Sequence, residues 1–257
     1  MTATRGSVTE VAQAAQAEGA SFASRIGQRL AGEDWAAVRM DLQEHGNAIL
    51  RKVLTPEECV RIAEMYPDGD TFRSRIVMAS HGFGRGEYKY FKYPLPDIIN
   101  SLRELLFPHL SKIANDWNGL LKQEGTYPSR HADYIAQCHE AGQTRPTPLL
   151  LQYGADDFNA LHQDLYGDMY FPIQAAVLLA QPGKDFKGGE FVMSDSGPEG
   201  AQLEVVPLEQ GDAVLFAVRE RPVPGKRGWR RAATRHGVSR VRSGHRHTVG
   251  IIFHDAR

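Results

Sequence analysis

The residues that could bind a metal ion are the most informative feature of this chain. The tetrapeptide Leu161-His162-Gln163-Asp164 places an imidazole two residues before a carboxylate. Residues two apart in a β-strand point to the same face, so the pair would present both ligands to one point. His236, far downstream, would complete the site. Two histidines and one carboxylate on one side of a metal, with the opposite positions open, are the ligand set that selects non-haem Fe(II) for oxygen chemistry.

The segments around this pair are needed to support the metal site, because His-x-Asp alone often arises by chance. Residues 169–180 form an apolar run of strand character, and shorter apolar segments follow at 190–193, 203–207 and 213–216. Turns rich in glycine, aspartate and proline separate them. A last strand ends near Phe253. This pattern predicts an antiparallel double sheet or barrel.

The order of these motifs resembles the Fe(II)- and 2-oxoglutarate-dependent dioxygenases. His-x-Asp is followed by Gly-Gly-Glu-Phe at 188–191, Gly-Asp-Ala-Val-Leu-Phe at 211–216, the distal His236, and Gly-x-Arg ending at Arg246. The resemblance covers about residues 149–255 and is strongest to the prolyl-hydroxylase-like branch. Within that branch, the chain is similar to a poorly characterised bacterial group with a suggested role, by distant analogy, in oxidising damaged nucleic acid. The fold it implies is a double-stranded β-helix, a jelly roll with iron in its mouth.

The resemblance also implies a role for each site residue. Iron would be held by His162, Asp164 and His236, and 2-oxoglutarate would chelate it beside dioxygen, with release of succinate and carbon dioxide. Arg246 would hold the far carboxylate of 2-oxoglutarate, for which a guanidinium suits because it forms a two-point fork. Tyr153 would donate its phenol to the same cosubstrate, and packing in the sheet is an equal alternative for this residue.

Other residues compete for two of these roles. The alternatives for the third metal ligand are His245, His247 and His254, of which none precedes the last strand as His236 does. Arg240 and Arg242 are weaker candidates for the anchor, and Arg246 itself could be a surface arginine. The remaining histidines carry no spacing signal, and we interpret them as ordinary surface or core residues: His45, His81, His109, His131 and His139.

Composition sets limits on the class of protein. A chain of 257 residues with 42% hydrophobic content can bury a sizeable core, so we expect one globular unit with an appended N-terminal part. A net charge of −1 gives no overall attraction to nucleic acid or to an anionic membrane. Cys59 and Cys138 imply no disulfide framework. With no apolar segment long enough to span a bilayer, we expect a soluble cytoplasmic protein.

We divide the chain into three parts. Residues 1–22 should be disordered or loosely helical, residues 23–148 should form a helical and mixed α/β support region, and residues 149–257 should form the catalytic core, continuous with the support region. The elements expected in the support region are helices within 22–44 broken near Gly32, a strand at 47–54, a helix started by the Thr55 cap with Pro56 and Glu58, a helix at 96–122 that Pro108 should kink or divide, one short helix within 125–148, and a strand at 149–153 where the core begins.

A segment rich in basic residues precedes the last strand. Glu220 is the one acidic residue among Arg219, Arg221, Lys226, Arg227, Arg230, Arg231, Arg235, Arg240, Arg242 and Arg246. The favoured interpretation is a solvated, flexible loop, and the alternative is an anion-recruiting lip beside the iron. Trp229, Tyr166 and Tyr170 could stack on bases or simply pack.

The leading hypothesis is a dioxygenase that hydroxylates an unidentified substrate, with a protein side chain or a small molecule ahead of nucleic acid. One rival is an oxidative demethylase of damaged DNA or RNA. A rival from another class is a non-catalytic jelly-roll module that binds a ligand, and a further one is a cupin-like enzyme that needs no 2-oxoglutarate. The sequence predicts no membrane partner and does not determine the oligomeric state.

Overall fold

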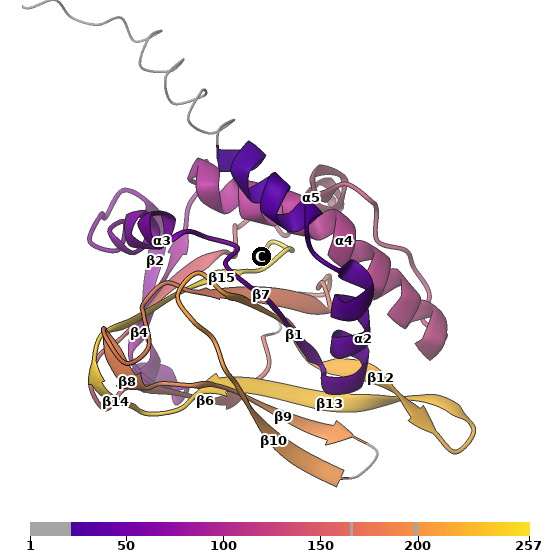
Figure 1. The fold of residues 1–257 in the computed structure, drawn as a ribbon. Coiled ribbons are helices and arrows are strands. Elements are labelled where there is room, and N and C mark those ends of the chain that lie inside the picture. The colour runs from indigo at the N-terminus through magenta and orange to yellow at the C-terminus, as the bar shows by residue number, and fades with distance from the viewer. Residues whose placement is uncertain (1–21, 165–166, 198–199) are drawn as a thin grey trace, which may run out of the picture.

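Two antiparallel sheets pack face to face, and helices cover the outer face of the larger one (Figure 1). The structure is a computed structural model that describes residues 22–164, 167–197 and 200–257, so the prediction for residues 1–22 falls almost entirely outside the described residues. Within these residues the larger sheet has the strand order β1-β11-β7-β15-β5-β4-β2. Its strands are β1 (Asn47–Leu50), β2 (Phe72–Val77), β4 (Glu87–Phe91), β5 (Leu149–Tyr153), β7 (Ile173–Leu178), β11 (Ala213–Ala217) and β15 (Arg246–Ile251).

The smaller sheet faces the larger one across the interior. Its order is β10-β9-β13-β6-β3, and β12 pairs with β13 off this path. Its strands are β3 (Gly84–Arg85), β6 (Phe158–His162), β9 (Phe191–Gly197), β10 (Gly200–Val206), β12 (Glu220–Gly225) and β13 (Gly228–Val238). A separate pair is formed by β8 (Phe186–Gly188) and β14 (Val241–Gly244). Strands β1, β2 and β4 come from the predicted support region, yet they lie in the same sheet as strands of the core.

The ends of the N-terminal helices are set by capping residues and by Gly32. A helix over residues 22–31 is followed by α2 (Trp35–His45), and the break falls at Gly32 as predicted. The Asp34 side chain caps α2 by accepting from two backbone amides. Helix α3 (Pro56–Ala63) starts with the predicted capping box, in which the Thr55 hydroxyl and the Glu58 carboxylate each accept from the other residue's backbone amide.

Two longer helices complete the covering layer. Helix α4 (Asp97–Leu121) continues through Pro108, so the division predicted at this proline does not occur. Burial along one face of α4 holds it against the larger sheet and so opposes the break that proline favours. Helix α5 (His131–Glu140) is the short helix expected in the polar connection, and η1 (Met78–His81) is a 3-10 turn.

The strand predicted at 47–54 is shorter than expected. It ends at Leu50, because the next residues turn with Lys52 in the left-handed region at φ 51°. The Asp212 carboxylate holds this turn, accepting from the Lys52 amide at 2.9 Å and from the Arg51 guanidinium at 2.6 Å. Asp212 immediately precedes β11, the partner of β1, so it fixes both strands at one end.

The interpretation of the basic segment as a flexible loop is wrong. Strands β12 and β13 pair along their length from Glu220 opposite Ala233 to Gly225 opposite Gly228. The pair projects from the smaller sheet as a two-stranded ribbon (Figure 1). Sequence reasoning missed it because arginines interrupt the apolar alternation that marks a strand.

Two features of composition can be compared with the structure. Cys59 and Cys138 are both buried free thiols, in keeping with the absence of a predicted disulfide framework. Among the described residues, no helix is both long enough and apolar enough to cross a membrane.

Candidate metal centre

The three predicted ligands lie together at one end of the interior. His162 is the last residue of β6, and it pairs directly opposite His236 on β13. Asp164 lies two residues beyond β6, so the expectation that both members of His-x-Asp sit in a strand is wrong for Asp164. The Nε2 atoms of His162 and His236 each lie 3.4 Å from an oxygen of Asp164. One ligand atom from each residue falls within 4.8 Å of the others, which is the arrangement one small ion requires.

Both imidazoles are held in orientations that suit metal binding. The His162 Nδ1 lies 2.8 Å from the Ala160 carbonyl, to which it donates, and this leaves Nε2 as the ligand atom. The His236 ring packs on Phe216, with 4.5 Å between ring centroids. Packing therefore fixes His236, since its Nδ1 is buried with no hydrogen-bond partner in the described part of the chain.

Electrostatics within the triad favour an ionised carboxylate. Burial would raise the pKa of Asp164, but hydrogen bonds and charge from His162 and His236 hold that pKa far below its usual range. Burial lowers the pKa of His236, with Asp164 opposing it. For His162, burial also lowers the pKa, and the neighbouring Asp164 outweighs it, so the pKa is raised. A charged carboxylate between two imidazoles is the donor set that a divalent cation needs.

Gln163 connects the two segments that supply the ligands. Its side-chain amide donates to the carbonyls of Arg219 and Thr234 at 2.9 and 2.8 Å. Thr234 lies on β13 two residues before His236, so Gln163 ties the Asp164 segment to the strand of the third ligand. Sequence analysis gave Gln163 no role. Its position in the sequence between two predicted ligands was the available signal.

A buried cation lies deeper in the same cavity. Arg246 is 1% exposed on β15, directly opposite Tyr153 on β5. Its Nη1 donates to the Thr248 hydroxyl at 2.6 Å, and its guanidinium carbon lies 5.6 Å from the Tyr153 ring centroid. Arg246 forms no ion pair with any described residue, and its Nε and the Tyr153 hydroxyl have no hydrogen-bond partner among those residues. Burial lowers the pKa of Arg246 to about 10.

A cavity of about 240 Å³ joins the triad to this arginine. Phe191 and Phe216 form part of its apolar wall. Gln174, which sequence analysis did not single out, also lines it and is 3% exposed, and its Nε2 has no partner within the described ranges. Orphaned buried donors carry a free-energy cost that a bound acceptor removes. The cavity therefore combines a metal-ligand set with donors suited to an anion.

The competing residues lie elsewhere. His247 packs near Tyr66, with 6.2 Å between ring centroids, and the His254 Nδ1 accepts from the Phe171 amide at 3.1 Å. His245 is exposed. Arg240 pairs with Asp156 at the surface. Arg242 is exposed on β14, and neither arginine lines the cavity.

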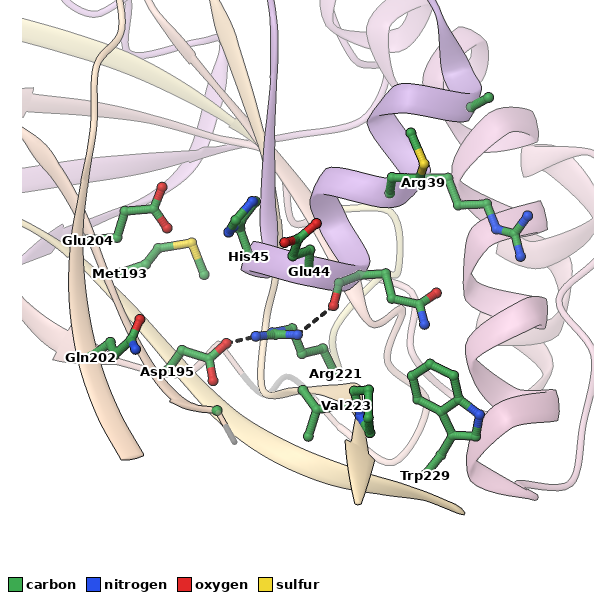
Figure 2. A pocket seen from close by; sticks show the side chains of 15 residues that line it. Arg39, Glu44, His45, Met193, Asp195, Gln202, Glu204, Arg221, Val223 and Trp229 are labelled. Carbon is green, nitrogen blue, oxygen red and sulfur yellow. Dashed lines mark hydrogen bonds and ion pairs between the residues drawn. The ribbon is translucent and has the colours of Figure 1, made fainter. Parts of the chain in front are cut away.

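A second, wider hollow of about 870 Å³ lies between α2 and strands β9, β10 and β12 (Figure 2). Arg221 crosses it, donating to the Asp195 carboxylate and to the Gln43 carbonyl. Neither the predicted ligands nor the anchor lies here. Among the described residues, the triad is the one cluster of metal-type ligands, and it lies outside this hollow.

Comparisons with known proteins agree with this geometry. Residues 86–256 match the Oxygenase-NA family, described as an "Oxygenase, catalysing oxidative methylation of damaged DNA". An uncharacterised protein present in two strains of Mycobacterium tuberculosis is 44% identical over 167 residues, which are 65% of this chain and 72% of that protein.

Two solved structures share the fold. A prolyl-4-hydroxylase from Pseudomonas putida aligns with a TM-score of 0.50 and 15% identity, over 87% of this chain and 99% of the other. An oxidoreductase of the 2OG-Fe(II) oxygenase family from Burkholderia pseudomallei aligns with a TM-score of 0.52 and 18% identity, over 88% of this chain and 93% of the other. The predicted fold class, a mainly β jelly-roll core flanked by helices, is confirmed.

Proposed function

The chain belongs to the Oxygenase-NA family, and on that premise we propose that it is an Fe(II)- and 2-oxoglutarate-dependent dioxygenase. One observation carries the proposal. The three ligand atoms lie within 4.8 Å of one another, in the same cavity as a buried arginine that forms no ion pair with any described residue and feels only the more distant charge of Glu190. A metal and a dicarboxylate together would satisfy both halves of the cavity.

The donor set fits both groups. His162, Asp164 and His236 would hold Fe(II), and Arg246 with Tyr153 would hold the far carboxylate of 2-oxoglutarate. Bound together with dioxygen, iron and 2-oxoglutarate supply an oxidative decarboxylation that hydroxylates a C–H bond and releases succinate and carbon dioxide.

The protein's own side chains position and shield this chemistry. The Ala160 carbonyl keeps the proton of His162 on Nδ1. Arg246 would form a two-point fork with a carboxylate, and Thr248 fixes the guanidinium for that contact. Phe191 and Phe216 exclude water from the wall beside His236, which strengthens the charge interactions inside.

The rival classes explain less of the cavity. A cupin-like enzyme without 2-oxoglutarate would have no need of Arg246 facing the metal side, yet this guanidinium is buried in the triad's own cavity. A non-catalytic binding module would need no preserved His-Asp-His set.

A second, more specific proposal names the substrate of this dioxygenase. The description of the Oxygenase-NA family names damaged DNA, and this supports the demethylase alternative. This moves nucleic acid ahead of a protein side chain or a small molecule as the proposed substrate. Hydroxylation of an N-linked methyl group would release it as formaldehyde, so formaldehyde from methylated DNA is the specific product to measure.

The test of the proposed function is spectroscopic. Anaerobic addition of Fe(II) and 2-oxoglutarate to the folded protein should produce a metal-to-ligand charge-transfer band, and admission of oxygen should give succinate without added substrate. Replacing Asp164 by Ala should abolish both signals with little change in the free energy of unfolding, because the ligand lies at the cavity and outside the apolar core. A wild-type protein that is folded and iron-loaded, yet shows no band, would overturn the proposal.

A further inference from the structure

We propose that the ribbon of β12 and β13, residues 220–238, is a docking element that binds the phosphate backbone of a nucleic acid and leads it to the metal centre. We call this element the basic ribbon. The inference deepens the proposed function and rests on it for the reason to bring a polymer to the metal. The binding itself can be measured independently of catalysis.

The charge of the basic ribbon is concentrated and largely uncompensated. Residues 220–235 contain six basic side chains and one acidic one, Glu220, although the whole chain carries a net charge of −1. Glu220 pairs with Arg231, and Arg221 pairs with Asp195. No ion pair to a described residue involves the other four, which are exposed: Lys226, Arg227, Arg230 and Arg235.

The base of the basic ribbon is anchored rigidly. Figure 2 shows Arg221 beside the Asp195 carboxylate, to which it donates. Arg221 also donates to the Gln43 carbonyl, so it ties β12 to both β9 and α2. On β13, the buried Thr234 hydroxyl donates to the Ala217 carbonyl at 2.9 Å. Because the ribbon is already ordered, it loses less conformational entropy on binding than a flexible loop would lose.

The direction and length of the basic ribbon favour a polymeric anion. Strand β13 begins at Gly228 beyond the turn that carries Arg227, and it runs without interruption to the ligand His236. Nine residues of strand span roughly 30 Å, the length of about nine phosphates on one strand of B-form DNA. A small anion would contact one end of the ribbon, whereas a polyphosphate backbone can contact cations at both ends, Arg227 at the turn and Arg235 next to His236.

The chemistry of the side chains favours nucleic acid over an acidic protein. Three of the four unpaired cations are arginines, which suit phosphate because their fork makes two parallel hydrogen bonds. Trp229 on the same ribbon is 41% exposed, and its indole lies at the opposite end of the hollow from Gln202 and Glu204 (Figure 2). An exposed indole beside arginines can stack on a base, and a two-stranded β-ribbon also fits the major groove of a duplex.

Binding of fluorescein-labelled DNA, single-stranded and duplex, to the full chain tests this proposal across a range of salt concentrations. The triple variant Lys226→Gln, Arg227→Gln, Arg230→Gln should bind single strands roughly tenfold more weakly at low salt. Its slope of log affinity against log salt should be smaller by about 2, since each lost phosphate contact removes roughly 0.7. Trp229→Ala should weaken binding while leaving the salt slope unchanged.

A matched control removes three exposed cations elsewhere. Lys184→Gln, Lys187→Gln, Arg242→Gln alters the β8 and β14 region, which in Figure 1 lies far from the turn between β12 and β13 that carries Lys226 and Arg227. This control should keep the wild-type affinity and salt slope. Equal losses in both triple variants would overturn the proposal, as would wild-type protein that binds no DNA in a salt-dependent way. Equally tight binding of polyglutamate, lost in the same ribbon variant, would also overturn it in favour of an acidic protein partner.

Succinate formation without substrate separates this proposal from the proposed function. It should be unchanged in the ribbon variant, because none of its three residues lines the metal cavity. DNA binding by a wild-type protein that forms no succinate would support the ribbon and overturn the dioxygenase. Succinate formation by a protein without salt-dependent DNA binding would do the reverse.

Discussion

Two arginines, Arg103 and Arg246, are each 1% exposed, and they sit in opposite electrostatic situations. Arg103 on α4 donates to the carbonyls of Ile252 and His254, to the Tyr93 hydroxyl, and to the Asp255 carboxylate at 2.7 Å. Arg246 has one hydroxyl partner and no ion pair within the described chain.

The difference separates a structural charge from a functional one. A buried charge is tolerated when its donors are satisfied and a counter-charge lies beside it. Arg103 meets that condition inside the folded chain, where it fastens α4 to the C-terminal segment. Arg246 has no carboxylate within ion-pair distance among the described residues, and Glu190 acts on it only from farther away. A bound carboxylate would supply the missing contact, and this is the physical reason to place a ligand there.

The largest expected effect comes from breaking the buried ion pair between Arg103 and Asp255. Asp255→Ala would leave the Arg103 guanidinium buried without its carboxylate, so the free energy of unfolding should fall by about 3–5 kcal/mol. Urea denaturation measures this loss. Arg246→Met is the matched change in the other region and should cost much less stability, because it removes a buried cation that has no ion pair among the described residues. If both variants lost the same stability, Arg246 would be structural and the contrast would fail.

The next effect concerns affinity for 2-oxoglutarate. Arg246→Lys keeps the charge and loses the fork, so binding should weaken by roughly 1.5–3 kcal/mol, about one to two decades in affinity. Arg246→Gln should cost more. Anaerobic titration of the charge-transfer band measures both, with iron binding expected to stay nearly intact.

Arg240→Gln is the control for that titration and should leave the affinity unchanged, since this arginine pairs with Asp156 at the surface. Wild-type affinity in both Arg246 variants would show that Arg246 does not anchor 2-oxoglutarate.

A smaller effect is the pH dependence that the Arg103 region should show. Burial would raise the pKa of Asp255, but the Arg103 charge and hydrogen bonds from Arg103, His139 and Tyr93 hold it below its ordinary value. A depressed folded pKa contributes stability above the unfolded pKa, roughly 3.9, and that contribution is lost as the pH falls through the folded pKa. The stability gap between wild type and Asp255→Asn should therefore be full at neutral pH and shrink below pH ~4. A gap that stayed constant to the acid limit would show that Asp255 is not charged in the fold.

The smallest effect concerns the side chain that positions the metal ligands. Gln163→Ala removes two hydrogen bonds that join the Asp164 segment to β13, so Fe(II) affinity should fall by about 1 kcal/mol, or about fivefold. Equilibrium metal titration with a chelator measures it. Gln202→Ala, on the exposed strand β10, is the control and should change nothing. An unchanged Fe(II) affinity in Gln163→Ala would mean that β6 and β13 position the ligands without this tie.

The sequence predicted the parts of the molecule that local rules govern. The capping box at Thr55 and Glu58 follows from short-range hydrogen bonding, and the helix break at Gly32 from backbone entropy. The His-x-Asp pair and the distal His236 were found from motif order, and the structure brings their ligand atoms together.

Local rules failed where a partner elsewhere in the chain decided the outcome. The strand predicted at 47–54 stops at Leu50 because Asp212, about 160 residues away, holds the turn. The ribbon forms because β13 pairs with strands on both sides, which outweighs its broken apolar pattern.

Charge compensation is the clearest case that only tertiary structure could decide. In the sequence, Arg103 and Arg246 are two of 30 basic residues. Although the spacing of Arg246 from His236 favoured an anchoring role, the sequence was also compatible with an arginine on the surface. The sequence by itself determined which residue types were present and in what order. The folded chain determined that Asp255 forms an ion pair with Arg103 and that no described carboxylate lies within ion-pair distance of Arg246. Compensation is a sum over neighbours drawn from distant segments, and those neighbours exist only once the sheets have packed.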